Sequence, residues 1–268
     1  MSQATASPET RSSLRVFVTG ASSGIGAALV RHYARQGAVV GMAARRAEAL
    51  DALAAEVRAL GGTPSGYVLD VTDAAALREA AGAYVARYGA PEIVIANAGI
   101  SAGTLTEYGE DLEVFRRIVE TNLYGMAATF APFIGPMREA GGSGRRLVGI
   151  ASVAGIRGLP GAEAYSASKA AAITYLESLR LEMRDSGIRV VTIAPGYIDT
   201  PMTEVNPYPM PFMIPADEAA RRFAAAIARG TSYAVIPWQM GVVAKLLRLM
   251  PNWLYDRLFA GAPRKPRL

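Results

Sequence analysis

The segment Leu14-Arg-Val-Phe-Val-Thr-Gly-Ala-Ser-Ser-Gly-Ile-Gly26 joins a mostly apolar run to a glycine-rich turn. Its first six residues are rich in apolar and β-branched side chains, which is typical of a strand buried on both faces. A helical pattern follows from Ala27 to about Gln36. The order strand, glycine turn, helix predicts a βα unit whose helix N-terminus offers free N–H groups and partial positive charge to phosphates.

The glycines of this turn have separate predicted tasks. Gly20 permits the tight turn, Gly24 lets the backbone approach a pyrophosphate, and Gly26 allows the helix to pack closely on the strand. Three residues separate the first two glycines, which is a variant of the general dinucleotide fingerprint, and such a turn taken alone could be an ordinary βα loop. The other cofactor contacts expected in the turn are Ser22, Ser23 and Ile25.

Strand and helix patterns alternate along the rest of the chain. The alternation predicts an α/β fold, with a doubly wound parallel sheet of about seven strands flanked by helices on both faces. No linker or repeat interrupts the pattern, and the length suits one large domain, so we expect a Rossmann-type catalytic domain over 14–237. Strands are expected at 38–43, 66–69, 92–96, 146–151, 189–194 and 233–236, and helices at 46–60, 73–88, 110–138 and 164–186.

Tyr165 and Lys169 lie four residues apart in a predicted helix, so their side chains share one face. A neighbouring ammonium favours the phenolate form of a tyrosine, because an opposite charge stabilises the charged species. We therefore expect Lys169 to lower the pKa of Tyr165 and to make its phenol a general acid or base. This spacing alone is usually only helix surface. Ser152 favours the catalytic interpretation, because it follows a predicted strand and can point into the crevice beyond the strand ends.

These motifs, in this order, resemble those of the short-chain dehydrogenase/reductase family in its single-domain form. The resemblance covers about residues 14–203 and implies the strand order 3-2-1-4-5-6-7. It also implies an enzyme that acts on CH–OH groups by interconverting a carbonyl and an alcohol. The motifs are 19–26, 97–99, Asn122, Ser152, Tyr165 and Lys169.

The resemblance implies roles for single residues as well. Ser152 would hydrogen-bond the substrate oxygen, and Tyr165 would exchange a proton with it. Lys169 would bind the nicotinamide ribose, and Asn122 would support a water-linked proton path through that lysine. The remaining implied cofactor contacts are Asp70, Val71, Asn97, Ala98, Gly99, Pro195, Gly196, Ile198 and Thr200, with Tyr165 and Lys169 added to them.

The end of the second strand bears on the choice of cofactor. Ala44 stands where the family has an acidic residue that holds the adenosine ribose, and Arg45 and Arg46 follow it. Arginine accommodates a 2′-phosphate, and Arg45 is the favoured partner because a guanidinium also stacks on adenine. We therefore expect NADP(H), with NAD(H) as the weaker alternative. The alternative to a phosphate site is that the two arginines are simply exposed to solvent at the start of the next helix.

Five prolines and several methionines characterise residues 201–215. The prolines are expected to forbid a regular helix and to stiffen the segment. Met202, Met213 and Phe212 would form an adaptable apolar lining over a hydrophobic carbonyl substrate. The alternative is that these side chains simply pack on the domain.

The composition excludes several kinds of site. The chain has no cysteine and one histidine, His32, so neither a disulfide framework nor a metal site is expected. The formal net charge of +5 is modest, and no basic motif with interleaved aromatic residues suggests nucleic acid. Residues 1–13 are polar and are expected to be disordered, without the apolar stretch of a signal peptide, which fits a cytoplasmic protein.

Residues 238–268 form an amphipathic extension beyond the last expected strand. Apolar residues recur there at helical spacing, and Pro251 divides them into two short helices. No apolar run of about 20 residues could span a membrane. Three interpretations stay open: packing over the domain or the substrate mouth, a subunit interface, and peripheral membrane association. Family members often form dimers or tetramers through the helices 110–138 and 164–186, so we expect a homo-oligomer, with a dimer favoured.

The combined pattern predicts an NADP(H)-dependent oxidoreductase in which Tyr165 is the general acid or base. Reduction of a hydrophobic ketone or aldehyde is the favoured direction, and only the cofactor preference supports that direction. An NAD-linked alcohol or steroid dehydrogenase is the enzymatic alternative. The second alternative is a protein that binds a dinucleotide as a sensor and catalyses no reaction. The presence of Ser152, Tyr165 and Lys169 disfavours it, because a sensor needs no residues for proton transfer.

Overall fold

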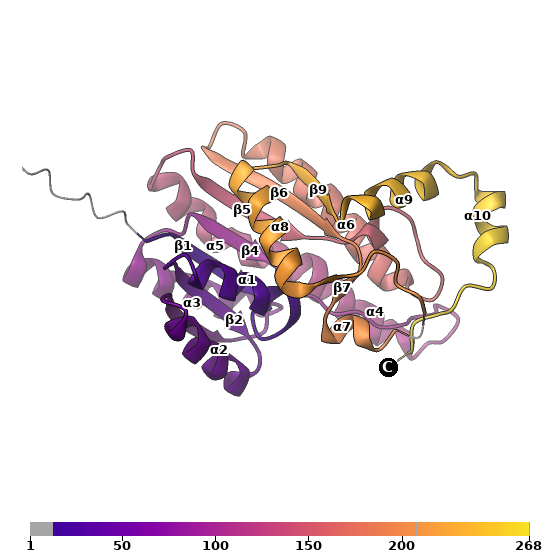
Figure 1. Ribbon diagram of the computed structural model, residues 1–268, viewed down its shortest axis with the longest axis horizontal. Helices are drawn as coiled ribbons and strands as arrows, with labels where there is room; N and C mark the ends of the chain where they lie inside the picture. Colours follow the sequence, from indigo (N-terminus) through magenta and orange to yellow (C-terminus); the bar gives the residue numbers. More distant parts are fainter. Residues whose placement is uncertain (1–12, 207, 268) are drawn as a thin grey trace, which may run out of the picture.

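A computed structural model describes residues 13–206 and 208–267, and a seven-stranded sheet forms its centre (Figure 1). All its strands run parallel, in the predicted order, with β9 as the seventh strand. The predicted α/β fold is therefore confirmed. Of the segment predicted to be disordered, all but Ser13 lies outside the described residues. The strands in spatial order are β3 (Thr63–Val68), β2 (Val39–Ala44), β1 (Arg15–Thr19), β4 (Ile93–Ala96), β5 (Arg145–Ile150), β6 (Ile188–Pro195) and β9 (Tyr233–Ile236).

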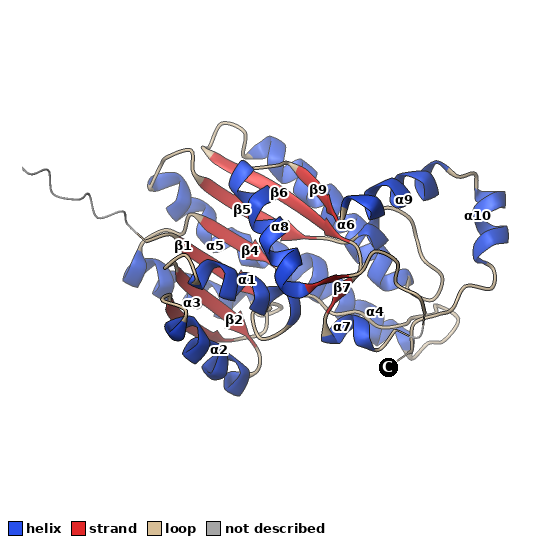
Figure 2. Cartoon of the chain, viewed as in Figure 1, coloured by secondary structure: helices blue, strands red, loops and turns tan. Residues whose placement is uncertain are grey.

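Helices cover both faces of this sheet (Figure 2). Three of them, α1 (Gly24–Ala34), α2 (Ala47–Ala59) and α8 (Ala216–Arg229), share one apolar core with the sheet. The opposite core is formed by α3 (Ala74–Tyr88), α5 (Gly125–Glu139) and α6 (Glu163–Glu182). Strand β1 shows why both faces need apolar residues, since alternate side chains point to opposite sides. Val16 and Val18 belong to the first core, and Phe17 belongs to the second.

The helix predicted over 110–138 is interrupted. It consists of α4 (Asp111–Val119), a π-helical turn (Glu120–Tyr124) and α5. A π-helical turn holds one residue more than an α-helical turn and is found mostly at functional sites. Asn122 lies in this turn and is completely buried. The prediction of one continuous helix was therefore wrong at the position that carries a candidate catalytic residue.

Two further boundaries differ from the predictions. Strand β3 begins at Thr63 rather than at 66, because it is an edge strand with mostly exposed or half-buried side chains that give no buried-strand signal. The segment 201–215 begins with a short helix, α7 (Pro201–Glu204). Pro201 occupies the first helical position, where a backbone N–H would have no hydrogen-bond partner within the helix, so its absence in proline costs nothing. The pair β7 (Ile198–Asp199) and β8 (Ile214–Pro215) encloses this segment, in which Pro207 lies outside the described residues.

The chain ends in two helices and a returning strap. Helices α9 (Trp238–Leu249) and α10 (Asn252–Phe259) are separated at Pro251, as predicted. Residues 260–267 then run back to the loop that follows β4. Arg267 donates to both carboxylate oxygens of Asp111, at 2.9 and 3.0 Å. Lys265 Nζ donates to Ser101 Oγ at 2.9 Å, so the strap is fastened to the domain.

Candidate functional site

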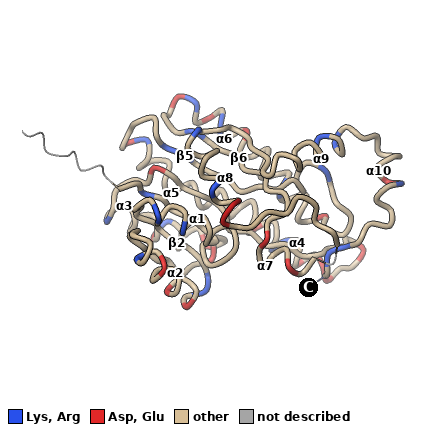
Figure 3. Tube along the Cα trace, viewed as in Figure 1, with Lys and Arg blue, Asp and Glu red and all other residues tan. Residues whose placement is uncertain are grey.

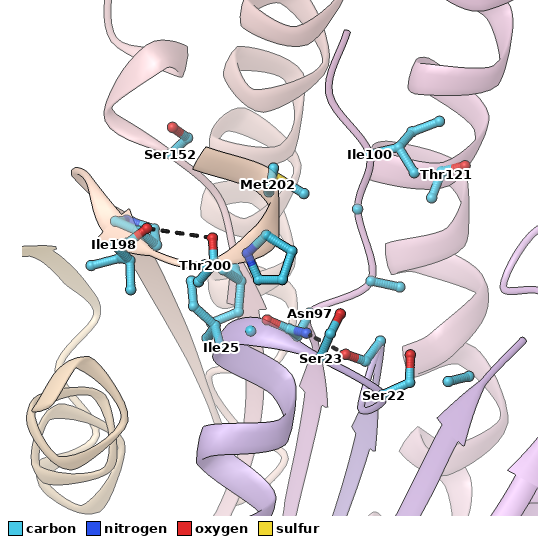
Figure 4. A pocket seen from close by; sticks show the side chains of 18 of the residues that line it. Ser22, Ser23, Ile25, Asn97, Ile100, Thr121, Ser152, Ile198, Thr200 and Met202 are labelled. Carbon is cyan, nitrogen blue, oxygen red and sulfur yellow. Dashed lines mark hydrogen bonds between the residues drawn. The ribbon is translucent and has the colours of Figure 1, made fainter. Parts of the chain in front are cut away.

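A cleft of about 290 Å³ opens at the carboxyl ends of the central strands. Its walls come from the segments that directly follow β1, β2, β4, β5 and β6, which is where ligands bind in sheets of this kind. Ser22 and Ser23 lie at one end and Ser152 at the other (Figure 4). Of the candidate residues, only Gly26 and Asn122 do not line it. Those that line it are Gly20, Ser22, Ser23, Gly24, Ile25, Arg45, Arg46, Asp70, Val71, Asn97, Ala98, Gly99, Ser152, Tyr165, Lys169, Pro195, Gly196, Ile198 and Thr200.

The glycine turn has the shape of a phosphate cradle. Gly20 has a φ of +66°, and a Cβ at this position would lie 2.7 Å from the Cα of Ala98. Gly24, with a φ of +52°, is also in the left-handed region that glycine adopts without strain. Helix α1 begins at Gly24, so its unpaired N–H groups face the cleft. Glycine at these positions lets the tight turn form, and the start of the helix presents donors to an anion.

Asn97 fixes this turn from the neighbouring strand. Its Nδ2 donates to the carbonyl oxygens of Thr19, at 3.1 Å, and of Gly20, at 3.2 Å. Its backbone N–H donates to Thr19 Oγ1. Gly26, which does not reach the cleft surface, packs against the same carbonyl of Gly20 and against the Asn97 amide. Asn97 and Gly26 therefore shape the turn from behind, while Ala98 and Gly99 continue the wall.

Arginine side chains surround the end of the cleft beside the turn. Arg46 Nη2 donates to Ser22 Oγ at 3.2 Å, which brings this guanidinium beside the glycine turn. Arg45 Nη1 lies 3.7 Å from Asp70 Oδ2, and both residues line the cleft. Ala44, the last residue of β2 and the neighbour of Arg45, is buried and carries no charge. Among the described residues that line the cleft there are three cations and one anion, so this site attracts an anionic ligand.

Ser152, Tyr165 and Lys169 meet at the other end. Ser152 follows β5, and its hydroxyl accepts from the N–H of Ala154 at 3.1 Å, which starts a short 3₁₀ turn (Val153–Gly155). Tyr165 and Lys169 come from successive turns of α6. Lys169 Nζ lies 5.8 Å from the centre of the Tyr165 ring and donates to the carbonyl of Ile150 at 2.9 Å. A phenol, a hydroxyl and an ammonium thus face one small volume.

Burial controls the protonation of these groups. It raises the pKa of Tyr165 above its ordinary value of 10.0, and a hydrogen bond with Ser152 opposes this effect. It also lowers the pKa of Lys169 from 10.5 to about 8. The expected lowering of the Tyr165 pKa by Lys169 is not found, because desolvation of the phenol dominates and the ammonium is directed at a carbonyl. At neutral pH the phenol is therefore protonated in the cofactor-free protein.

Asn122 lies behind the cleft and connects two of its walls. Its Oδ1 accepts from the N–H of Ile100 at 2.8 Å, and its Nδ2 donates to the Ile100 carbonyl at 3.0 Å. The same Nδ2 donates to Ser168 Oγ, which in turn donates to the carbonyl of Tyr165 at 2.8 Å. The π-helical turn thus joins the strand-β4 wall to the first turn of α6. A water-linked proton path from Asn122 stays a prediction.

The segment after β6 closes the cleft opposite the turn. Ile198 is buried, and its carbonyl accepts from Thr200 Oγ1 at 3.4 Å (Figure 4) and from Thr203 Oγ1 at 2.7 Å. Gly196 packs closely against Met240 of α9, where a Cβ would lie 2.5 Å from Met240 Cγ. These contacts hold the backbone at 195–200 in one position along the cleft.

Several lining residues were missed from the sequence. They are Ile100, Thr121, Ile150, Ala151, Pro201 and Thr203. Most lie next to a quoted motif, and this adjacency was the available signal. All three apolar residues expected to cover the substrate, Met202, Phe212 and Met213, are exposed, and of these Met202 lines the cleft.

Comparison with known proteins finds one family and several similar oxidoreductases. Residues 15–208 match the short chain dehydrogenase family. An uncharacterized oxidoreductase of Myxococcus xanthus is 41% identical over 90% of this chain and 94% of its own length. A 3-oxoacyl-[acyl-carrier-protein] reductase of Thermotoga maritima is 36% identical over 71% of this chain and 76% of its own. The crystal structure of an actinorhodin polyketide ketoreductase with NADPH is 29% identical and superposes with a TM-score of 0.78 over 87% of this chain and 98% of its own.

Proposed function

Because this chain belongs to the short-chain dehydrogenase/reductase family, and so is an NAD(P)-dependent oxidoreductase acting on CH–OH groups, we propose that it reduces a hydrophobic ketone or aldehyde with NADPH. One observation carries the proposal. A single cleft brings together Ser152, Tyr165 and Lys169 at one end and Arg45 and Arg46 at the other. The first group suits proton transfer to an oxygen, and the second suits a phosphate.

The cleft fits a dinucleotide phosphate in shape and in charge. The glycine turn packs so closely on Ala98 that no side chain fits at Gly20, and the start of α1 offers N–H donors to a pyrophosphate. Arg45 and Arg46 would hold the 2′-phosphate, since a guanidinium pairs well with phosphate oxygens. Neutral Ala44 places no carboxylate at the end of β2, and the nearby carboxylate of Asp70 is paired with Arg45. When bound, the reduced nicotinamide supplies the hydride that reaches the carbonyl carbon.

The chain's own residues supply the proton. Ser152 would donate a hydrogen bond to the substrate carbonyl oxygen and hold it beside the Tyr165 phenol. Because burial raises its pKa, the phenol carries its proton at neutral pH and can give it to the oxygen as negative charge develops there. Lys169, still mostly protonated at pH 7 with a pKa of about 8, would then stabilise the phenolate that remains. A protonated phenol is the form that reduction of a carbonyl requires.

Two observations support an apolar substrate. Met202 reaches the cleft from α7, and a flexible thioether adapts to apolar ligands of varied shape. Two relatives are a 3-oxoacyl carrier-protein reductase and a polyketide ketoreductase by name. An acyl chain with a ketone group is therefore the substrate class we favour.

A panel of carbonyl compounds tests this function. Purified protein would be given long-chain 3-oxoacyl thioesters, cyclic ketones, aldehydes and polar keto acids, each with NADPH and with NADH. The proposal expects the highest kcat/KM for an apolar ketone with NADPH. Faster oxidation of alcohols with NAD⁺ would support the dehydrogenase alternative instead. Tight NADPH binding without turnover of any compound would support the sensing alternative.

We also propose that the protein self-associates through α4, the π-helical turn and α6. Leu112, Tyr124 and Leu181 are exposed on these helices although they are large and apolar. Tyr124 also lines a mostly apolar groove with Leu123 and with Tyr175 of α6, and an exposed apolar groove is typical of an association surface. Sedimentation velocity should give a dimer, and Tyr124→Glu should shift it to the monomer. A wild-type protein that stays monomeric at all concentrations would contradict this arrangement.

A further inference from the structure

Helices α9 and α10 carry large apolar side chains that the domain does not cover. Each exposes between 49 and 82% of its surface. On α9 they are spaced by four, four and three residues, so they form one stripe along the helix. The helices stand at the end of the molecule away from β3 (Figure 1). We call these residues the tail surface: Trp238, Val242, Leu246, Leu249, Trp253 and Leu258.

The other side of both helices is fixed to the domain. Met240 and Ala244 of α9 are buried, as is Tyr255 of α10. Tyr255 Oη donates to the carbonyl of Gly158 at 2.6 Å, and its ring lies 4.2 Å from the guanidinium carbon of Arg157. The exposed stripe therefore cannot turn inward without breaking these contacts. A fixed, exposed apolar surface of this kind usually marks an interaction site.

The two helices that carry the tail surface have an excess of positive charge. They contain three basic residues, Lys245, Arg248 and Arg257, and one acidic residue, Asp256. All three basic residues are exposed, and Figure 3 shows basic positions along α9 and α10. The expected partner is therefore apolar at its centre and anionic at its surface.

The geometry points to an anionic lipid bilayer as the occupant of the tail surface, with α9 and α10 lying in the interface between headgroups and acyl chains. Amphipathic helices that bind in this way combine tryptophan and leucine on one face with lysine and arginine at its edges. No helix in the described part of the chain is long and apolar enough to cross a membrane. The association is thus peripheral.

A second copy of the chain fits this surface less well. In a two-fold symmetric contact the same patch lies on both sides. Both copies would then bring Lys245, Arg248 and Arg257 into the contact, and α9 and α10 of each copy offer only Asp256 to balance them. Like charges across an interface disfavour association. The anionic headgroups of a bilayer would instead pair with all three basic side chains.

The chain contains a built-in reporter of this association. Its two tryptophans, Trp238 and Trp253, both belong to the tail surface. Fluorescence of the full-length protein would be measured with vesicles of phosphatidylcholine alone and of phosphatidylcholine with phosphatidylglycerol. We expect an emission blue shift with the anionic vesicles and quenching when their lipids carry brominated acyl chains. Each basic residue near an anionic bilayer strengthens binding about fivefold, so three of them predict affinity about a hundredfold higher than for phosphatidylcholine.

Variants separate the apolar and the charged contributions. Leu246→Ser with Leu249→Ser keeps both tryptophans and should weaken vesicle binding at least about tenfold. Lys245→Gln, Arg248→Gln and Arg257→Gln together should reduce anionic binding to the phosphatidylcholine level. Val68→Ser is the matched control, because Val68 is 63% exposed, close to the 61% of Leu246, but lies on β3. It should bind vesicles as the wild type does.

Three results would overturn the inference. They are unshifted and unquenched tryptophan emission with anionic vesicles, equal affinity for both vesicle types, and a blue shift that grows with protein concentration without vesicles. The last result would identify a second copy as the occupant. Thermal unfolding by circular dichroism shows whether each variant is folded. Carbonyl reduction is measured separately, so failure of docking and failure of the proposed function can be told apart.

Discussion

Lys169→Met is expected to stabilise the cofactor-free protein at neutral pH while it removes a residue needed for turnover. Lys169 is 4% exposed, and its ammonium has one hydrogen bond, to the carbonyl of Ile150. Methionine has a similar length and no charge, so it fills the same space. The substitution therefore removes a buried charge without opening a large cavity.

The magnitude follows from the pKa of this lysine. The folded-state pKa of about 8 lies below 10.5, the value in an unfolded chain, so the native state disfavours the ammonium by about 3 kcal/mol. Loss of the hydrogen bond to Ile150 offsets about 1 kcal/mol of this gain. The net increase in the free energy of unfolding at pH 7 is then about 2 kcal/mol. Between pH 8 and 10.5 the native state binds fewer protons than the unfolded state, so wild-type stability rises with pH and the advantage of the variant disappears.

Urea unfolding of both proteins at pH 7 and at pH 10 measures this difference. We expect Lys169→Met to be more stable than the wild type at pH 7 and no more stable at pH 10. Lys245→Met, which removes an exposed lysine on α9, is the matched control and should change stability little. A variant less stable than the wild type at pH 7, or a difference that is the same at both pH values, would refute the reasoning.

The remaining predictions concern the cofactor, the substrate oxygen and the buried support of the cleft. Arg45→Ala and Arg46→Ala should each raise the KM for NADPH about five- to tenfold, because a charge-assisted contact to phosphate is lost at an exposed site. The KM for NADH should stay unchanged. Equal effects on both cofactors would argue against a 2′-phosphate site. Ser152→Ala should lower kcat about a hundredfold with unchanged NADPH affinity in fluorescence titration, and an unchanged kcat would exclude its role at the substrate oxygen. Asn122→Leu leaves the N–H and carbonyl of Ile100 without their side-chain partner and should lower the free energy of unfolding by about 2–3 kcal/mol in urea, whereas unaltered stability would contradict the buried link.

Much of the fold could be predicted from local patterns. The buried strands β1, β4 and β6 are nearly continuous apolar runs, and such runs occur where both faces of a strand are covered. The glycine turn could be placed because it connects one such strand to a helical pattern. The edge strand β3 was misplaced because its half-exposed residues do not form such a run.

Features that depend on tertiary contacts could not be predicted. The π-helical turn at Asn122 was not predicted, because it spans only five residues and helical residues lie on both sides of it. The high pKa of the Tyr165 phenol depends on how completely its surroundings exclude water, whereas sequence spacing reveals only the nearby lysine. The strap from Arg267 to Asp111 joins residues 156 positions apart. Spacing showed which residues could meet, and packing determined their environment.

The most direct test of the proposed mechanism compares wild-type protein with Tyr165→Phe at saturating NADPH and a ketone substrate. This change removes one hydroxyl and keeps the ring in the cleft. The expected result is a fall in kcat of at least about a hundredfold, with an unchanged dissociation constant for NADPH. A variant that turns over at nearly the wild-type rate would show that the phenol of Tyr165 does not deliver the proton.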